Sequence, residues 1–174
     1  MKRNNIDLGV LGGVLARAAD DPSVLRLHKR VDGEWSFEEG RPAYQAVIAH
    51  GGASTTARVD IAPGFGGGGT APDPLQYLLA GLGACYAATV VTIAAMEGAE
   101  IRRLAVSAEL DANVARVYDL GDAPLVERVA VTVTVEADAD DEALARWRDA
   151  ARVKCPFAFT VQHAVPFETT VERA

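Results

Sequence analysis

A long stretch without a single charged side chain, residues 78–95, limits the possible folds of this chain more than any other feature. We expect it to form most of a helix that begins at Pro74, because Asp73 can accept hydrogen bonds from the first helical amides and proline suits the first position. The helix should run to about Glu97 and stop at Gly98. Since it has no polar face, it must be covered on nearly all sides. Its glycines and threonines favour a central core helix over a membrane span.

Alternating apolar residues around this helix predict antiparallel β-structure. The expected strands are residues 43–50, 58–61, 101–115, 126–137 and 165–171. Residues 140–153 have the period of an amphipathic helix. The fold class is therefore α+β, with one domain over residues 41–174. It follows an N-terminal extension, residues 1–40, which is weakly patterned apart from a helix-like stretch at 6–19 and a turn at Asp32–Gly33.

Charge and composition exclude several classes of function. The formal net charge of -7 repels a phosphate backbone, so no nucleic-acid partner is expected. Two cysteines without CxxC spacing and three scattered histidines make no zinc site, and we expect neither a metal nor a cofactor. The histidines are His28, His50 and His163. The glycine-rich run 64–69 lacks the Lys-Ser/Thr of a phosphate loop and predicts a flexible connection. Neither a signal peptide nor a membrane span is expected, which places the protein in the cytoplasm.

The two cysteines, Cys85 and Cys155, are the candidates for covalent chemistry. A distant pair of this kind is either two buried small residues or a redox couple. Cys85 lies in the apolar helix, where burial makes a thiol inert unless a cation approaches from elsewhere in the fold. Cys155 precedes Pro156, which can open a short helix through about His163, and amides at a helix N-terminus favour the thiolate. Local physics alone therefore makes Cys155 the more acidic thiol.

Two motifs resemble the OsmC-like family. Residues 72–85, PDPLQYLLAGLGAC, are similar to the family motif P-x-P-x-E-x-L-L-x-A-x-x-x-C, and residues 154–157, KCPF, look like its C-P motif. The resemblance covers about residues 44–171. It implies an OsmC-like fold, in which antiparallel sheets pack on long central helices in an intertwined homodimer. It also implies that Cys85 attacks an organic hydroperoxide and becomes a sulfenic acid, that Cys155 resolves it as a disulfide, and that a dithiol protein supplies the electrons.

The sequence departs from this family at two supporting positions. The family's helix glutamate falls on Gln76, and the arginine of its peroxidases falls on Ala53. Arg58 and Arg41 are the candidates to replace that cation. Its loss makes the thiolate harder to form, by about 1.4 kcal/mol for each pKa unit. A thiol-dependent peroxidase that acts in oxidative-stress defence is the leading hypothesis. The alternative is a non-catalytic OsmC-like protein that binds a small hydrophobic ligand in the pocket beside Cys85.

Overall fold

The computed structural model describes residues 1–173. They form two units: unit 1 comprises residues 1–9 and those from 81 onward, and unit 2 comprises residues 10–80. The helices are α1 (Leu8–Asp20), α2 (Pro74–Met96), α3 (Asp141–Lys154) and α4 (Pro156–Gln162). The strands are β1 (Lys2–Arg3), β2 (Ile6–Asp7), β3 (Asp32–Trp35), β4 (Tyr44–His50), β5 (Ala53–Val59), β6 (Ile101–Ala112) and β7 (Val126–Ala137). Short 3-10 turns lie at Pro22–Leu25, Pro63–Phe65 and Ala115–Tyr118.

The long helix α2 begins where the sequence predicts and ends within one turn of the expected residue. At its start, the Asp73 carboxylate accepts a hydrogen bond from the Gln76 amide, and the Gln76 side-chain oxygen accepts one from the Asp73 amide, each at 2.9 Å. This reciprocal capping box satisfies two amides that have no partner inside the helix. At the other end, Gly98 adopts a φ of +84°, which breaks the helix.

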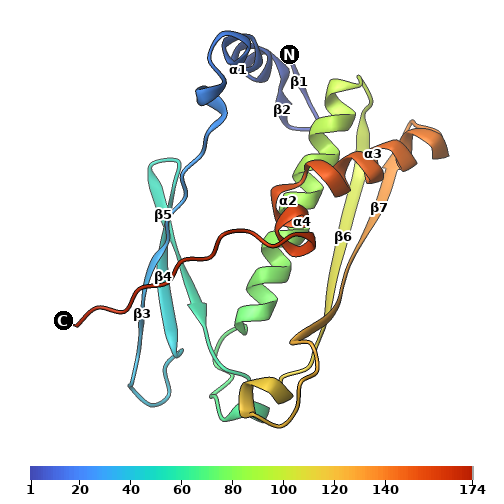
Figure 1. Ribbon diagram of the computed structural model, residues 1–174. Coiled ribbons are helices and arrows are strands. Elements are labelled where there is room, and N and C mark those ends of the chain that lie inside the picture. The colour runs from blue at the N-terminus through green and yellow to red at the C-terminus, as the bar shows by residue number, and fades with distance from the viewer. Residues whose placement is uncertain (174) are drawn as a thin grey trace. The chain divides into compact units, whose positions relative to one another are not determined.

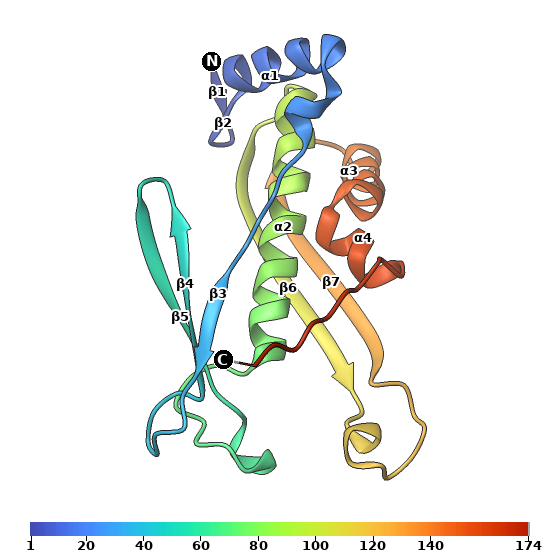
Figure 2. The same cartoon turned by 60° about the vertical axis from the view of Figure 1, so that its left-hand side comes forward.

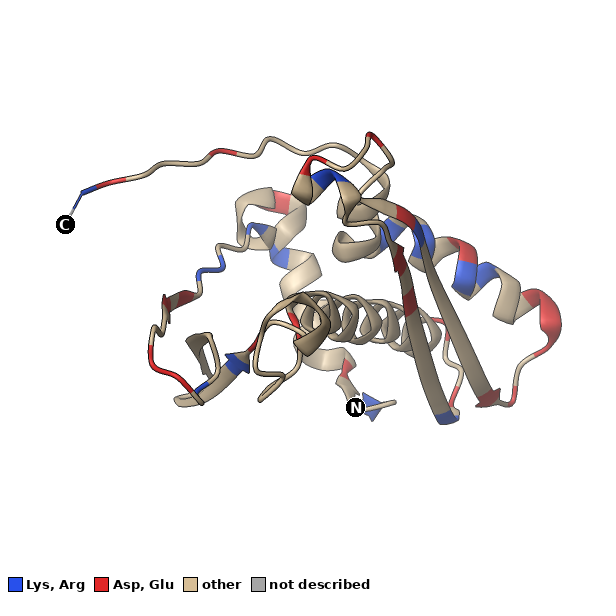
Figure 3. Ribbon diagram, turned by 90° about the horizontal axis from the view of Figure 1, so that it is seen from below, with Lys and Arg blue, Asp and Glu red and all other residues tan. Residues whose placement is uncertain are grey.

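Only one side of α2 is covered, which contradicts the expectation that nearly all of it is enclosed. Its buried residues are Leu82, Gly83, Tyr86, Val90, Ala94 and Ala95. By length and composition α2 could span a membrane, and 28% of its most apolar window is buried, although the core helix of a soluble protein passes the same test. Figure 3 shows α2 without a charged residue along its length, in contrast to α3. The remaining apolar surface therefore needs another covering.

Unit 1 is built around one side of α2. Helices α2 and α3 lie over the β6–β7 hairpin, and α4 continues directly from α3 (Figures 1 and 2). The side chain of Trp147 on α3 is 1% exposed and packs into the same core as Leu82 of α2. Asp140 caps α3 by accepting a hydrogen bond from the Ala143 amide at 2.8 Å. Because apolar residues of all three elements meet, the amphipathic pattern predicted for residues 140–153 is confirmed.

Strands β6 and β7 confirm the second predicted pair. They run antiparallel, with Val106 opposite Val133 and Ala108 opposite Val131. The expected closing strand, residues 165–171, is wrong for the described chain, because residues 164–173 have neither helix nor strand. Val165 is 45% exposed and Val171 fully exposed. Alternation fits such a segment for a strand, but a strand forms only when an edge pairs with its amides and carbonyls.

Unit 2 contains a three-stranded antiparallel sheet in the order β3-β4-β5. The predicted pairing across Gly51–Gly52 is confirmed by His50 lying opposite Ala53. The predicted turn at Asp32–Gly33 is wrong, because both residues belong to β3. Gly33 serves there as a strand residue without a side chain, since the Tyr44 ring occupies the place of its Cβ. The choice of glycine reflects close packing and not a turn.

The connection that follows β5 is organised by Asp60, and not simply by its glycines. Asp60 is 4% exposed. Its carboxylate accepts hydrogen bonds from the Thr70 amide at 2.8 Å, the Thr70 hydroxyl at 2.7 Å and the Ile61 amide at 2.8 Å. The pKa of the carboxyl is held below its usual value, chiefly by the bonds from Thr70. The flexible connection predicted for residues 64–69 is therefore a loop tied at both ends.

The start of the N-terminal extension is anchored to unit 1. Residues Asn4 and Asn5 have φ values of 51° and 63° and turn the chain between β1 and β2. The Asn4 side chain donates to the Ala99 carbonyl at 3.0 Å and accepts from the Ile101 amide at 2.9 Å. This contact joins the first residues of the chain to the connection between α2 and β6. Nothing in the sequence pattern predicts it.

Candidate functional site

Cys155 lies at the junction of α3 and α4 and is fully buried. It ends α3, where its amide donates to the Ala151 carbonyl at 2.9 Å, and it also caps the start of α4. In the second role its sulfur accepts a hydrogen bond from the Ala158 amide at 3.5 Å. Pro156 suits the first position of α4 because it has no amide to satisfy. The short helix predicted after this proline is therefore present, with the sulfur in the capping position.

Cys85 projects from α2 toward the same junction. It is half-buried, and its sulfur accepts a hydrogen bond from the backbone N–H of Phe157. A thiol–thiol hydrogen bond joins Cys85 to Cys155. The first amides of α4 thus serve both sulfurs, Phe157 that of Cys85 and Ala158 that of Cys155. The two cysteines, 70 positions apart in the chain, share one site, and both are reduced.

The Cys85 thiol is held mainly in its protonated form. Burial raises its pKa, because a thiolate loses hydration in an apolar setting, and the neighbouring Cys155 raises it further. The Phe157 amide acts in the opposite direction by stabilising the thiolate. Among the groups in residues 1–173 that shift this pKa, no basic side chain takes part. The amide is therefore the group at the site that activates Cys85.

Tyr86 connects the cysteine helix to α3. Its hydroxyl donates to the Arg148 carbonyl at 2.9 Å. Burial, and then the nearby Cys155, raise the pKa of the phenol. Sequence reasoning missed both Tyr86 and Phe157, although each directly adjoins a candidate cysteine or its proline. The only available signal was their position within the two motifs.

The supporting residues predicted from the sequence all lie in unit 2, where each has another contact. Gln76 takes part in the capping box of α2. Arg41 pairs with Glu38 at 2.8 Å, and both side chains are exposed. Arg58 is an exposed residue of β5 whose carbonyl accepts a hydrogen bond from the Tyr77 hydroxyl at 2.8 Å. The structure thus joins Cys85 with Cys155 and gives these three residues local contacts of their own.

The histidines have local roles where contacts are seen. His50 hydrogen-bonds to Thr55 at 2.8 Å, and His163 stacks on Phe159 with ring centroids 4.3 Å apart. No cluster of three or more His, Cys, Asp or Glu side chains suited to a metal occurs within residues 1–173.

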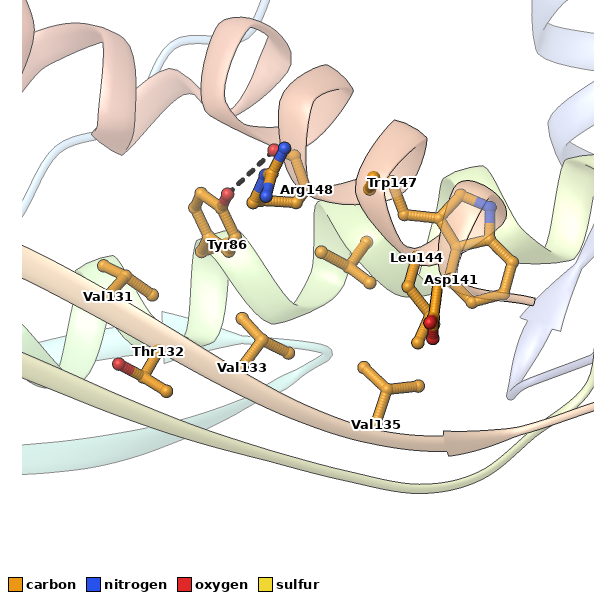
Figure 4. A pocket seen from close by; sticks show the side chains of 11 residues that line it. Tyr86, Val131, Thr132, Val133, Val135, Asp141, Leu144, Trp147 and Arg148 are labelled. Carbon is orange, nitrogen blue, oxygen red and sulfur yellow. Dashed lines mark hydrogen bonds between the residues drawn. The ribbon is translucent and has the colours of Figure 1, made fainter. Parts of the chain in front are cut away.

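A cavity of about 420 Å³ lies between α3 and β7, next to the cysteine helix. Figure 4 shows Tyr86 and Arg148 at one end and Trp147 and Asp141 toward the other. Its floor is formed by valines of β7: Val131, Val133 and Val135. Neither cysteine lines this cavity, so it adjoins the thiol site through Tyr86 without including it.

Comparison with known proteins gives a family and a fold. The family model described as OsmC-like protein matches residues 66–170. An OsmC-like protein of unknown function from Vibrio cholerae has a TM-score of 0.61 at 15% identity, over 79% of this chain and 95% of that one. An OsmC like protein from Mycoplasma pneumoniae has a TM-score of 0.56 at 17% identity, over 78% and 89% of the two chains.

An organic hydroperoxide resistance protein from Legionella pneumophila has a TM-score of 0.51 at 15% identity, over 79% of this chain and 92% of that one. No curated protein sequence matches the chain. At these identities the structural likenesses show the fold alone. They confirm the predicted α+β architecture.

Proposed function

Since this chain belongs to the OsmC-like family, we propose that it is a thiol-dependent peroxidase that reduces organic hydroperoxides in oxidative-stress defence. Cys85 is the thiol that reacts with the peroxide, and Cys155 is the thiol that resolves the product. A redox or hydroperoxide-resistance role is supported by the family and by the name of the related Legionella protein. The assignment of the two cysteines is the finer part of the proposal.

The observation that carries this assignment is the different burial of two hydrogen-bonded thiols. Cys155 is 0% exposed, whereas Cys85 is only half-buried, so an oxidant meets Cys85 first. Because the two sulfurs already lie in contact, a disulfide can close without a large rearrangement of the backbone. This order agrees with the family resemblance and reverses the expectation from the α4 N-terminus alone.

The reaction proceeds in three balanced steps. The Cys85 thiolate attacks one oxygen of the hydroperoxide, so that an S–O bond forms, the O–O bond breaks and the alcohol leaves after taking up a proton. The Cys155 thiol then attacks the sulfenic sulfur, which forms the disulfide and releases water. A dithiol protein reduces the disulfide by thiol–disulfide exchange and is itself oxidised.

A cation beside Cys85 would make the thiolate easier to form, and Arg58 is the better candidate. Arg41 already pairs with Glu38, whereas Arg58 has no ion pair among residues 1–173. An arginine brought near a thiol lowers its pKa by one to several units. Arg58 therefore takes, in this proposal, the role that falls on Ala53 in the family motif.

We also propose a cytoplasmic homodimer. The part of α2 left uncovered in one chain is apolar and contains small exposed residues such as Ala84 and Ala88. A second copy would bury this surface, as the family's intertwined arrangement implies, and would leave a soluble protein. Two reduced thiols in contact suit a reducing compartment.

A binding protein without turnover is the second candidate. Two observations favour it: the raised pKa of Cys85, and the cavity of about 420 Å³ with an apolar floor beside Tyr86. Cavities of this size suit small hydrophobic ligands. In that case the cysteines would be buried core residues.

One experiment separates the two functions. The fully reduced protein is mixed with cumene hydroperoxide or with hydrogen peroxide, and the Cys85–Cys155 disulfide is measured by peptide mass. The peroxidase should form the disulfide faster with cumene hydroperoxide. Cys155→Ser should stop at the sulfenic acid, and Cys85→Ser should give neither product. If neither oxidant yields the disulfide and both thiols stay unreactive at neutral pH, the peroxidase assignment is wrong and the binding function replaces it.

A further inference from the structure

Phe157 touches α2 at two places, through its ring and through its backbone. The tip of the ring lies over Gly81, so that a Cβ built there would stand 3.2 Å from Cζ and 3.4 Å from Cε1. The backbone N–H of the same residue donates to the sulfur of Cys85. Because Gly81 and Cys85 are four residues apart, they lie on one face of the helix, separated by roughly 6 Å along its axis.

We propose that Gly81 is a positioning residue for the reactive thiol: its missing side chain lets the Phe157 ring lie on α2, and this contact holds the Phe157 amide against the Cys85 sulfur. The inference rests on the proposed function in one respect, that Cys85 is the reactive thiol. The N–H of Phe157 is the donor that favours the Cys85 thiolate. Its position therefore governs how readily the thiol ionises.

The alternatives for this glycine are weaker. Its backbone is helical, so no left-handed conformation requires a glycine there. Glycine inside a helix costs up to about 1 kcal/mol relative to alanine, so the position is unfavourable for the helix itself. The OsmC-like motif has alanine at this position, and here the glycine accompanies a phenylalanine whose ring needs the space. Packing against Phe157 is the feature that offsets the poor helix propensity.

Gly83 provides a matched control on the same helix. A Cβ built there would meet Val106 at 3.5 Å and Ala108 at 3.8 Å, which are ordinary contacts, and it would not meet Phe157. Gly81→Ala and Gly83→Ala therefore gain the same helix propensity, but only Gly81→Ala displaces the ring. In Gly81→Ala the neighbour must move by a few tenths of an ångström, and in Gly81→Val by more.

The test measures the alkylation rate of Cys85 by iodoacetamide between pH 6 and 10, in the reduced full-length chain, by peptide mass. Gly81→Ala should slow Cys85 alkylation at neutral pH by about threefold to tenfold and move its pH profile to higher pH, because a charge-assisted hydrogen bond is weakened. Gly81→Val should slow it further. Gly83→Ala should keep the wild-type profile. Gly81→Ala should also be as stable as wild type or more so, which separates positioning from general damage.

Phe157→Leu in the Gly81→Ala background supplies the rescue. Leucine lacks the ring tip that the new Cβ meets but keeps the backbone N–H, so alkylation should return toward the wild-type profile. An unchanged profile in Gly81→Ala, or a failure of Phe157→Leu to restore it, would overturn the proposal. Since alkylation needs no peroxide, a shifted profile in a protein that forms no disulfide would refute the peroxidase function and leave this inference intact.

Discussion

Removal of the Glu97 carboxylate should loosen the attachment of α3 to the cysteine helix. The indole N–H of Trp147 donates to Glu97 Oε2 at 2.8 Å, and the Trp147 side chain is 1% exposed. In Glu97→Ala this buried donor loses its acceptor, which costs about 1–3 kcal/mol. Arg146 also pairs with Glu97, at 3.5 Å, but this pair is largely exposed and contributes about 0–1 kcal/mol. We therefore expect a loss of about 1.5–3 kcal/mol in the free energy of unfolding.

Urea denaturation and thermal unfolding both measure this loss. For a chain of this size each kcal/mol lowers Tm by about 2–4 °C, so Glu97→Ala should unfold about 3–12 °C below wild type. The chain has two tryptophans, and Trp35, the other one, is 51% exposed. In a Trp35→Phe background the fluorescence therefore reports Trp147 alone. Its emission should shift to longer wavelength in Glu97→Ala if water reaches the freed indole.

Two variants at the same helix end decide the cause. Glu97→Gln keeps a side-chain oxygen that can accept the indole hydrogen bond, and it should retain most of the stability. Glu100→Ala removes an exposed acid just beyond α2 and should change stability by no more than about 0.5 kcal/mol. Equal Tm values for Glu97→Ala and Glu100→Ala would refute the reasoning, because they would show that the buried indole does not depend on its acceptor.

Three further predictions follow from the fold. Asp60 has a depressed pKa, so its stabilising effect is present above the ordinary carboxyl value near pH 4 and is lost as the pH falls through the folded-state pKa. The Tm difference between wild type and Asp60→Asn should therefore be constant above about pH 5 and shrink in acid. Asp73→Ala removes the cap of α2 and should lower the free energy of unfolding by about 1 kcal/mol in urea titrations, unless the helix start is already frayed. Light scattering should give twice the chain mass of 18.3 kDa; Ala88→Arg, on the exposed part of α2, should produce monomers, whereas Ser107→Arg on β6 should not.

Local sequence signals were sufficient for most elements of the fold. The boundaries of α2 followed from Asp73, Pro74 and Gly98, because caps and breakers act within one helical turn. Strands β6 and β7 followed from their alternation. The errors occurred where a residue's role is set by a distant partner. Gly33 was taken for a turn residue because the sequence does not show that the Tyr44 ring lies over it.

The sequence by itself determined that two cysteines carry the chemistry, that one lies in an uncharged helix and that the other precedes a proline-initiated helix. Tertiary structure alone decided that the two sulfurs meet and that one short helix supplies an amide to each. It also decided that Cys155 is the deeper thiol and that Gln76 is a helix cap. The physical reason is that thiol reactivity depends on burial and on donors within a few ångströms, and both depend on how segments far apart in the chain pack.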